Sequence, residues 1–269
     1  MTSDPPPGSA PEPEVWLVPP GYVPPDPDET PPLDLHKATT GVRPWATLAL
    51  VLTWTLVVLV MAMRRELGDR AAYLAWGASA TGMPPLETTW RLLASTFLHD
   101  GLPHLFFNGL SMLVYGPAVE RLFGRRGFWP VFALGGAAAS LASNVWRAQH
   151  GAPSVSLGAS GAIFALGGGL LAAALRLRHR LGVGRARALG AALLFLLIQS
   201  LAGGVTTAGT DNVAHAAGLL SGFVVALLLP LAPGVGGPAR APAATALAAL
   251  CAAALAISFA IGARTGLGL

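Results

Sequence analysis

The sequence predicts an all-α fold, a polytopic bundle of transmembrane helices. Of the 269 residues, 53% are hydrophobic and only 11% are charged, whereas soluble domains carry about 25% charged residues. The apolar residues fall in runs of about twenty, the length that crosses roughly 30 Å of hydrocarbon. Too few charges are present to solvate a globular surface, which excludes a water-soluble enzyme.

Residues 1–44 differ in composition from the rest of the chain. They contain 13 of the 23 prolines, and seven acidic residues stand against only Lys37 and Arg43. Such a segment cannot bury enough apolar area to offset the entropy cost of ordering it, so we expect a disordered acidic tail. The chain then divides into this tail, a membrane core at 45–231, and a linker with one additional transmembrane helix at 232–269.

Seven apolar segments are expected to be helices, and the first should act as an uncleaved signal anchor. They are Trp45–Met63, 103–123, 128–147, 157–175, 188–205, 212–231 and 241–262. Most connections are short, which favours antiparallel neighbours. The connection at 64–102 is long and rich in aromatic and aliphatic residues, so we expect it to lie partly in the membrane interface.

The distribution of positive charge orients the bundle. With a cytoplasmic N-terminus, eleven Lys and Arg residues lie on the cytoplasmic side and six lie outside, which favours this orientation. We expect a multi-pass protein of a bacterial plasma membrane. The net charge of +4 comes from arginines that flank apolar segments, so no nucleic-acid partner is indicated. A single cysteine, Cys251, excludes an intrachain disulfide and a cysteine-based zinc cluster, and no metal or cofactor is predicted.

Polar residues inside apolar segments are costly and therefore mark candidate functional sites. His104 and Asn108 are four residues apart and share one face of the second segment. Ser160 follows Gly158 near the start of the fourth segment, and His215 lies in the first turns of the sixth. Three separate segments thus carry side chains suited to acyl-transfer chemistry.

A serine and a histidine on separate helices meet only if those helices pack closely. Small residues occur near both side chains: Gly161 in one segment, and Ala214, Gly218 and Gly222 in the other. The GxxxG spacing of the last two glycines lets helix backbones come into contact. The histidine could then activate the serine hydroxyl as a nucleophile, and the donors at positions 104 and 108 could stabilise an oxyanion.

No acid occupies the place of a third catalytic member. Asp211, four residues before His215, is expected to be the N-cap of the sixth helix. Phe164 lies one turn after Ser160 on the same face and is expected to stack on the imidazole ring. The sequence therefore predicts a Ser–His dyad.

In combination, these residues resemble a rhomboid intramembrane serine protease over roughly residues 45–231. The motifs that carry the resemblance are the WR pair (Trp90, Arg91), the HxxxN helix with a preceding histidine (His99, His104, Asn108), an ER-type pair (Glu120, Arg121), the GxSG motif (Gly158 to Gly161) and the AHxxG motif (Ala214 to Gly218). Five motifs in the family's order make the resemblance specific.

The resemblance implies a six-helix core whose active site opens toward the extracytoplasmic face, here followed by one more helix. It implies that Ser160 is the nucleophile and His215 the base. The Ser160 backbone N–H, His104 and Asn108 would be the oxyanion donors. The implied reaction is cleavage of transmembrane-helix substrates within the lipid bilayer, without a cofactor.

The resemblance also assigns supporting roles. Trp90 and Arg91 would hold the interfacial loop, and Gly158 would support the oxyanion site. One position departs from the family's pattern: Phe164 stands where tyrosine is often found. Stacking on the imidazole is kept, but a hydroxyl is lost.

Two other functions agree with parts of the pattern. An inactive rhomboid-like protein would bind transmembrane helices for quality control or trafficking, but such proteins usually lack the serine or the histidine, and both are present here. A small transporter or channel would carry acids deep in several helices, whereas Glu120 and Asp211 lie at segment ends.

Overall fold

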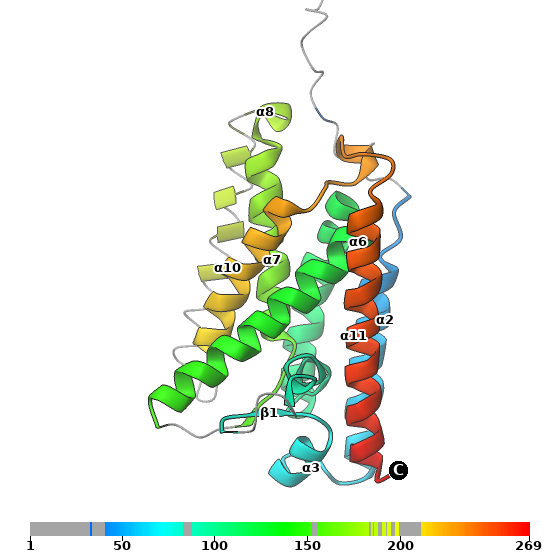
Figure 1. Ribbon diagram of the computed structural model, residues 1–269, viewed down its shortest axis with the longest axis vertical. Coiled ribbons are helices and arrows are strands. Elements are labelled where there is room, and N and C mark those ends of the chain that lie inside the picture. Colours follow the sequence, from blue (N-terminus) through cyan, green and yellow to red (C-terminus); the bar gives the residue numbers. More distant parts are fainter. Residues whose placement is uncertain are drawn as a thin grey trace, which may run out of the picture. The chain divides into compact units, whose positions relative to one another are not determined.

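The fold is a bundle of helices, seen in the computed structural model (Figure 1). The structure describes residues 33, 41–82, 88–151, 155–182, 184, 186–187, 190–191, 193–194, 197–198 and 211–269. Most of the predicted segment 188–205 and of the predicted tail 1–44 lies outside these residues. Among the described residues, three helices are long and apolar enough to cross a membrane, and the predicted helical membrane bundle is confirmed.

Five long helices make up most of the described chain. They are α2 (Trp45–Met63), α6 (Gly101–Gln149), α7 (Ser160–Arg176), α10 (Asn212–Leu228) and α11 (Pro242–Leu267). The connections contain α3 (Arg70–Ala75), α5 (Arg91–Ala94), α8 (Arg178–Leu181) and the 3-10 turns η1 (Ser95–Phe97) and η2 (Pro233–Val235). Strands β1 (Ser79–Ala80) and β2 (Val155–Ser156) pair antiparallel, with Ser79 opposite Ser156.

Two predicted helices, 103–123 and 128–147, are the halves of α6. They are separated only by Gly124, whose φ of 65° and ψ of −178° are not helical. Glycine adopts such a conformation without a steric penalty, so the helix changes direction there. The second half then runs diagonally across the bundle (Figure 1).

Two helix ends also differ from the predicted bounds. The sixth predicted helix was expected to reach residue 231, but α10 ends at Leu228 because Leu229 is extended and Pro230 follows. The last predicted helix, 241–262, continues to Leu267 in α11. It ends at Gly268, which has a left-handed conformation.

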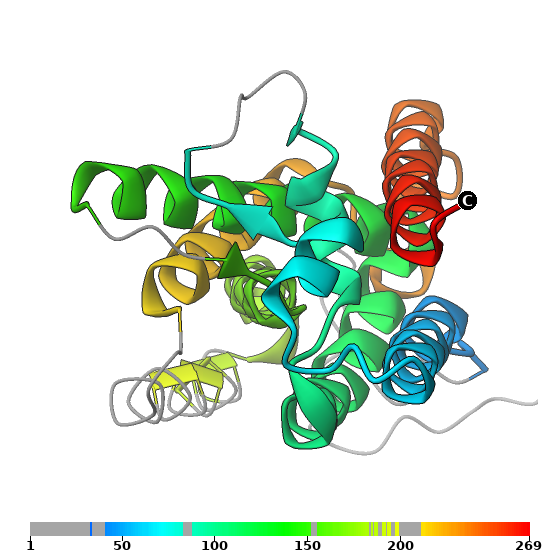
Figure 2. The same ribbon diagram turned by 90° about the horizontal axis from the view of Figure 1, so that it is seen from below.

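Helix α7 is the centre of the bundle. Most of its residues are buried, and Figure 2 shows it nearly end-on between α10 and α6. Its contact with α10 is made through backbone. A β-carbon on Gly218 would overlap the Gly161 carbonyl, and one on Gly222 would overlap the backbone of Ala165. The GxxxG spacing therefore brings these two helices together.

The N-terminus of α2 is capped by a distant side chain. The Glu120 carboxylate accepts hydrogen bonds from the backbone N–H groups of Ala46 and Thr47, at 3.1 and 2.9 Å, and from the Thr47 hydroxyl at 2.7 Å. Both Glu120 and Thr47 are buried. Because the first N–H groups of a helix have no partners within it, this contact fastens α2 to α6.

The last helix, α11, holds the long first loop. Gly262 lies against the Trp76 carbonyl and Gly266 against the Trp76 indole ring. Phe259 packs on Phe97 with ring centroids 4.9 Å apart, and the Thr265 hydroxyl donates to the carbonyl of Ala75. The seventh helix is therefore a direct support for the connection that leads to the candidate site.

We predict that Gly266→Leu lowers the unfolding temperature of the purified protein, because the new side chain collides with the Trp76 ring. Overpacking of this kind costs about 1–3 kcal/mol. Ala260→Leu is the matched control, since Ala260 is exposed on the same helix and an added side chain there meets only lipid. An unfolding temperature for Gly266→Leu equal to that of Ala260→Leu would contradict this packing.

Candidate active site

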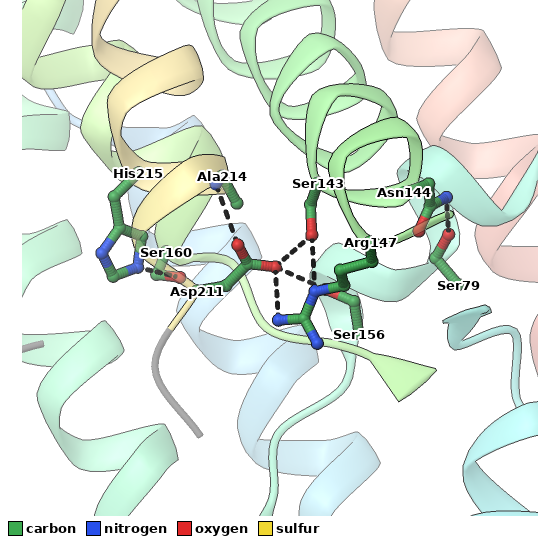
Figure 3. Close-up of polar contacts among 9 residues, drawn as sticks. All are labelled: Ser79, Ser143, Asn144, Arg147, Ser156, Ser160, Asp211, Ala214 and His215. Carbon is green, nitrogen blue, oxygen red and sulfur yellow. Dashed lines mark hydrogen bonds and ion pairs between the residues drawn. The ribbon is translucent and has the colours of Figure 1, made fainter. Parts of the chain in front are cut away.

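The Ser160 and His215 side chains meet at one end of the bundle. Ser160 is the first residue of α7, and His215 lies in the first turn of α10. The Ser160 Oγ is 2.8 Å from the His215 Nε2, within hydrogen-bond distance (Figure 3). A hydroxyl in this position can pass its proton to the imidazole.

The small residues around this pair explain how the two helices come so close. Gly161, next to the serine, faces the Ala214 carbonyl and the Ala139 side chain, and an added β-carbon would lie 2.7 Å from the β-carbon of Ala139. One turn further along, Gly218 lies against the Gly161 carbonyl. Larger side chains at these positions would separate the helices and the two reactive groups with them.

The His215 ring is held by stacking. Phe164 lies parallel to it, with ring centroids 4.3 Å apart and an interplanar angle of 13°. Among the described residues, the buried Nδ1 of His215 has no hydrogen-bond partner. The orientation of the imidazole therefore comes from an aromatic contact and from helix packing, without a carboxylate on Nδ1.

Gly158 fixes the approach of the chain to Ser160. Its φ of 116° is accessible to glycine and strained for other residues, and its N–H donates to the Ser95 carbonyl at 2.9 Å. The predicted helix 157–175 consequently begins later, at Ser160. A β-carbon at Gly158 would lie 2.8 Å from the Cε1 and Nε2 atoms of His104, so the imidazole of His104 flanks this turn.

His104 can present a donor beside the nucleophile. Its Nδ1 accepts a hydrogen bond from the backbone N–H of Asp100 at 3.2 Å, so a neutral ring carries its proton on Nε2. The Asn108 Nδ2 donates to the His104 carbonyl at 3.1 Å. This bond uses one of the two amide hydrogens of Asn108, and the other remains for a ligand.

Comparison with known proteins identifies the family of the segment that contains this site. A model of the Rhomboid domain matches residues 86–231, more than half of the chain. The chain belongs to the rhomboid family. It is a multi-pass membrane protein, and the motifs around Ser160 and His215 both lie inside the matched range.

Several curated relatives carry the rhomboid name. Rhomboid protease GluP of Bacillus subtilis (strain 168) is 36% identical over 158 residues, 59% of this chain and 29% of that protein. Putative rhomboid protease YdcA of the same organism is 32% identical over 139 residues, 52% of this chain and 66% of YdcA. RHOMBOID-like protein 2 of Arabidopsis thaliana is 35% identical over 147 residues, 55% of this chain and 44% of that protein. Each match spans less than two thirds of the relative.

The WR pair of this rhomboid lies in the first loop, away from the dyad. The Arg91 guanidinium donates to the carbonyls of Leu74 and Ala78, at 2.5 and 3.1 Å, and lies over the Trp90 ring at 4.5 Å. The Trp90 ring also fills the space beside Gly77. These contacts tie α5 to the segment that contains α3.

A polar cluster beside the dyad contains residues that sequence reasoning missed. Asp211 caps α10 through a hydrogen bond from the Ala214 N–H at 3.0 Å, as its position predicted. It also contacts Ser143, Arg147 and Ser156. No local pattern indicates these contacts, because the partners are at least 55 residues away in the chain. Within the described part of the chain, no group of three potential metal-ligating side chains occurs.

We predict that Phe164→Leu slows the reaction of Ser160 with a fluorophosphonate probe, whereas Phe164→Tyr reacts at the wild-type rate. Leucine fills the space but cannot stack, and an aromatic pair contributes about 0.5–1.5 kcal/mol beyond its buried area, or up to about tenfold in rate. Equal labelling rates for the leucine and tyrosine variants would show that stacking does not orient the base.

Proposed function

We propose that this rhomboid is an intramembrane serine endopeptidase that cleaves transmembrane-helix substrates through a Ser160–His215 dyad. The contact of 2.8 Å between the Ser160 Oγ and the His215 Nε2 carries the proposal. Membership of the rhomboid family supports it, as does the similarity to rhomboid protease GluP and putative rhomboid protease YdcA. The presence of both dyad members argues against an inactive helix-binding protein.

The first chemical step forms an acyl-enzyme. The Ser160 Oγ attacks the carbonyl carbon of the scissile peptide while its proton moves to the His215 Nε2. The tetrahedral intermediate then collapses as the peptide C–N bond breaks, and the imidazolium returns the proton to the leaving amine. Positioned acid–base catalysis of this kind typically contributes about 10²–10⁴-fold.

The oxyanion is stabilised by donors on two elements. The backbone N–H of Ser160 is free for a ligand because the first N–H groups of a helix have no partner within it, and Ser160 is the first residue of α7. The Nε2–H of His104 and the second amide hydrogen of Asn108 complete the set. They stabilise the negative charge as it develops in the transition state.

Water completes the cycle by attacking the acyl-enzyme with His215 as general base, which releases the acid product and restores Ser160. Ser160 lies at the very start of its helix and is partly exposed. A cavity of about 20 Å³ adjoins it, lined in part by Ser95, Ser140 and Ser156. That volume accommodates about one water molecule.

The orientation that we propose has a cytoplasmic N-terminus. The basic residues between positions 176 and 187 then lie in the cytoplasm, and the dyad opens toward the extracytoplasmic face. A substrate helix would unwind near its outer end to expose the scissile bond to Ser160. The carbonyl group of the scissile bond could then reach Ser160 close to the membrane surface, so no water channel across the bilayer would be needed.

We predict that Ser160→Ala and His215→Ala abolish cleavage of a model transmembrane protein in proteoliposomes, because each removes one partner of the proton transfer. Thr245→Ala is the matched control, since the exposed Thr245 hydroxyl on α11 bonds only to the carbonyl of Ala241, one turn earlier in the chain. Fragments would be identified by mass spectrometry. Wild-type cleavage by a folded Ser160→Ala variant would refute the proposed function.

We predict that Asn108→Ala lowers kcat while leaving measurable cleavage. Removal of one oxyanion donor typically costs about 10²–10³-fold, and the Ser160 N–H and His104 remain. Leu110→Ala, at an exposed position on the same helix, should keep wild-type kcat. An Asn108→Ala variant with full kcat would exclude this side chain from the oxyanion site.

A further inference from the structure

The cluster around Asp211 joins three parts of the fold next to the dyad. One carboxylate oxygen, Oδ2, accepts hydrogen bonds from the Ser143 hydroxyl and, more weakly at 3.4 Å, from the Ser156 hydroxyl. The same oxygen is 3.0 Å from the Arg147 Nη2, and the Arg147 Nε donates to the Ser143 Oγ at 3.1 Å. Figure 3 shows these groups converging from α6, β2 and α10.

The two oxygens of Asp211 have separate tasks. Oδ1 accepts a hydrogen bond from the N–H of Ala214, the residue before His215, and so caps α10. Oδ2 faces α6. Neither is bonded to the His215 Nδ1, which has no hydrogen-bond partner among the described residues. Asp211 therefore does not act as the acid of a catalytic triad, and its contacts instead fasten the start of α10 to α6.

The cluster extends to the first loop. Ser156 belongs to β2, opposite Ser79 on β1, and the Ser79 hydroxyl accepts a hydrogen bond from the Asn144 Nδ2 at 2.7 Å. Strand β2 ends two residues before Gly158, where the chain turns toward Ser160. The side chains of α6 thus hold the segments that lead to both members of the dyad.

Side-chain hydrogen bonds also hold α10 at its far end. There the Arg176 guanidinium donates to the carbonyls of Ala226 and Leu229, at 3.0 and 2.6 Å. His215 lies about 16 Å from Ala226 along the helix, at 1.5 Å per residue, so a tilt of about 4° moves it by about 1 Å. A misplacement of that size can cost about 10²-fold in rate.

Packing through glycine sets the separation of α7 and α10 but leaves fewer side chains to resist sliding along the helix axis. The contact between α7 and α10 is made by backbone at Gly161, Gly218 and Gly222, and surfaces without side chains have few features that interlock along the helix axis. The Asp211 and Arg147 side chains are only 15% and 23% exposed. Their attraction is therefore screened less than that of an exposed pair.

We propose that Asp211 and Arg147 form an ionic clamp that sets the position of α10, and thereby the distance between the Ser160 Oγ and the His215 Nε2. Both are positioning residues for the reaction, since they act through His215 and touch neither substrate nor reacting atoms. This inference rests on the proposed peptidase function and adds to it the element that keeps the dyad assembled.

The decisive variant is Asp211→Asn, because asparagine caps a helix about as well as aspartate but carries no charge for Arg147. We expect the rate of fluorophosphonate labelling of Ser160, and kcat for a transmembrane substrate, to fall by about 10- to 100-fold. KM should stay unchanged, since the clamp does not contact substrate. Asp69→Asn is the matched control: Asp69 caps α3 in the same way, and its variant should label at the wild-type rate.

Changes at Arg147 test the charge pair from the other side. Arg147→Gln should label as slowly as Asp211→Asn, and Arg147→Lys, which keeps the charge, should recover most of the wild-type rate. The double variant Asp211→Asn/Arg147→Gln should be no slower than either single variant, because all three lack the same interaction. Should Asp211→Asn fail to fold, the comparison of Arg147→Lys with Arg147→Gln still tests whether the charge at position 147 sets the labelling rate.

Three results would overturn the clamp: wild-type labelling in Asp211→Asn, a change in KM alone, or losses that add in the double variant. Failure of the proposed function has a different signature, since the wild-type protein would then neither react with the probe at Ser160 nor cleave substrate. A wild-type protein that labels at Ser160 together with an unaffected Asp211→Asn variant would reject the clamp alone.

Discussion

The backbone contact between α7 and α10 is the constraint on which the candidate site depends. Gly161 and Gly218 leave no side chain between the helices, and only at that separation can a serine on one helix contact a histidine on the other at 2.8 Å. The GxxxG spacing is often no more than a packing device. Here the packing and the chemistry coincide, because Gly161 and Gly218 each lie within a turn of a dyad residue.

The surrounding elements position the side chains and segments that the glycine contact does not fix. Phe164 orients the imidazole by stacking, and the turn at Gly158 directs the chain into α7 beside His104. Glu120 fastens α2 to α6 through buried hydrogen bonds, while α11 supports the first loop at Trp76. Most of these contacts use backbone groups as one partner, which suits a bilayer interior where an unpaired N–H or carbonyl is costly.

Burial of polar groups is concentrated at one end of the bundle, where α7 and α10 begin. The Asp211 cluster, the serine hydroxyls and the dyad all lie there, while the outward surfaces of α2, α6 and α11 carry exposed leucine, valine and phenylalanine. This asymmetry agrees with a bundle that faces lipid along its sides and admits water at one end. The hydrolysis that we propose needs both conditions, since its substrate would be a membrane helix and water is the second reactant.

Local sequence patterns were enough to predict the helical membrane fold, the bounds of α2 at Trp45–Met63, and the residues able to form a dyad. The span length, the apolar composition and the cost of buried polar groups are all local properties. The sequence also predicted Asp211 as an N-cap, since capping acts within three residues. The pairing of Asp211 with Arg147, the capping of α2 by Glu120 and the support of Trp76 by α11 are seen only in the folded chain. These contacts join residues far apart in the chain, and their energy depends on how the helices pack, which no local pattern encodes.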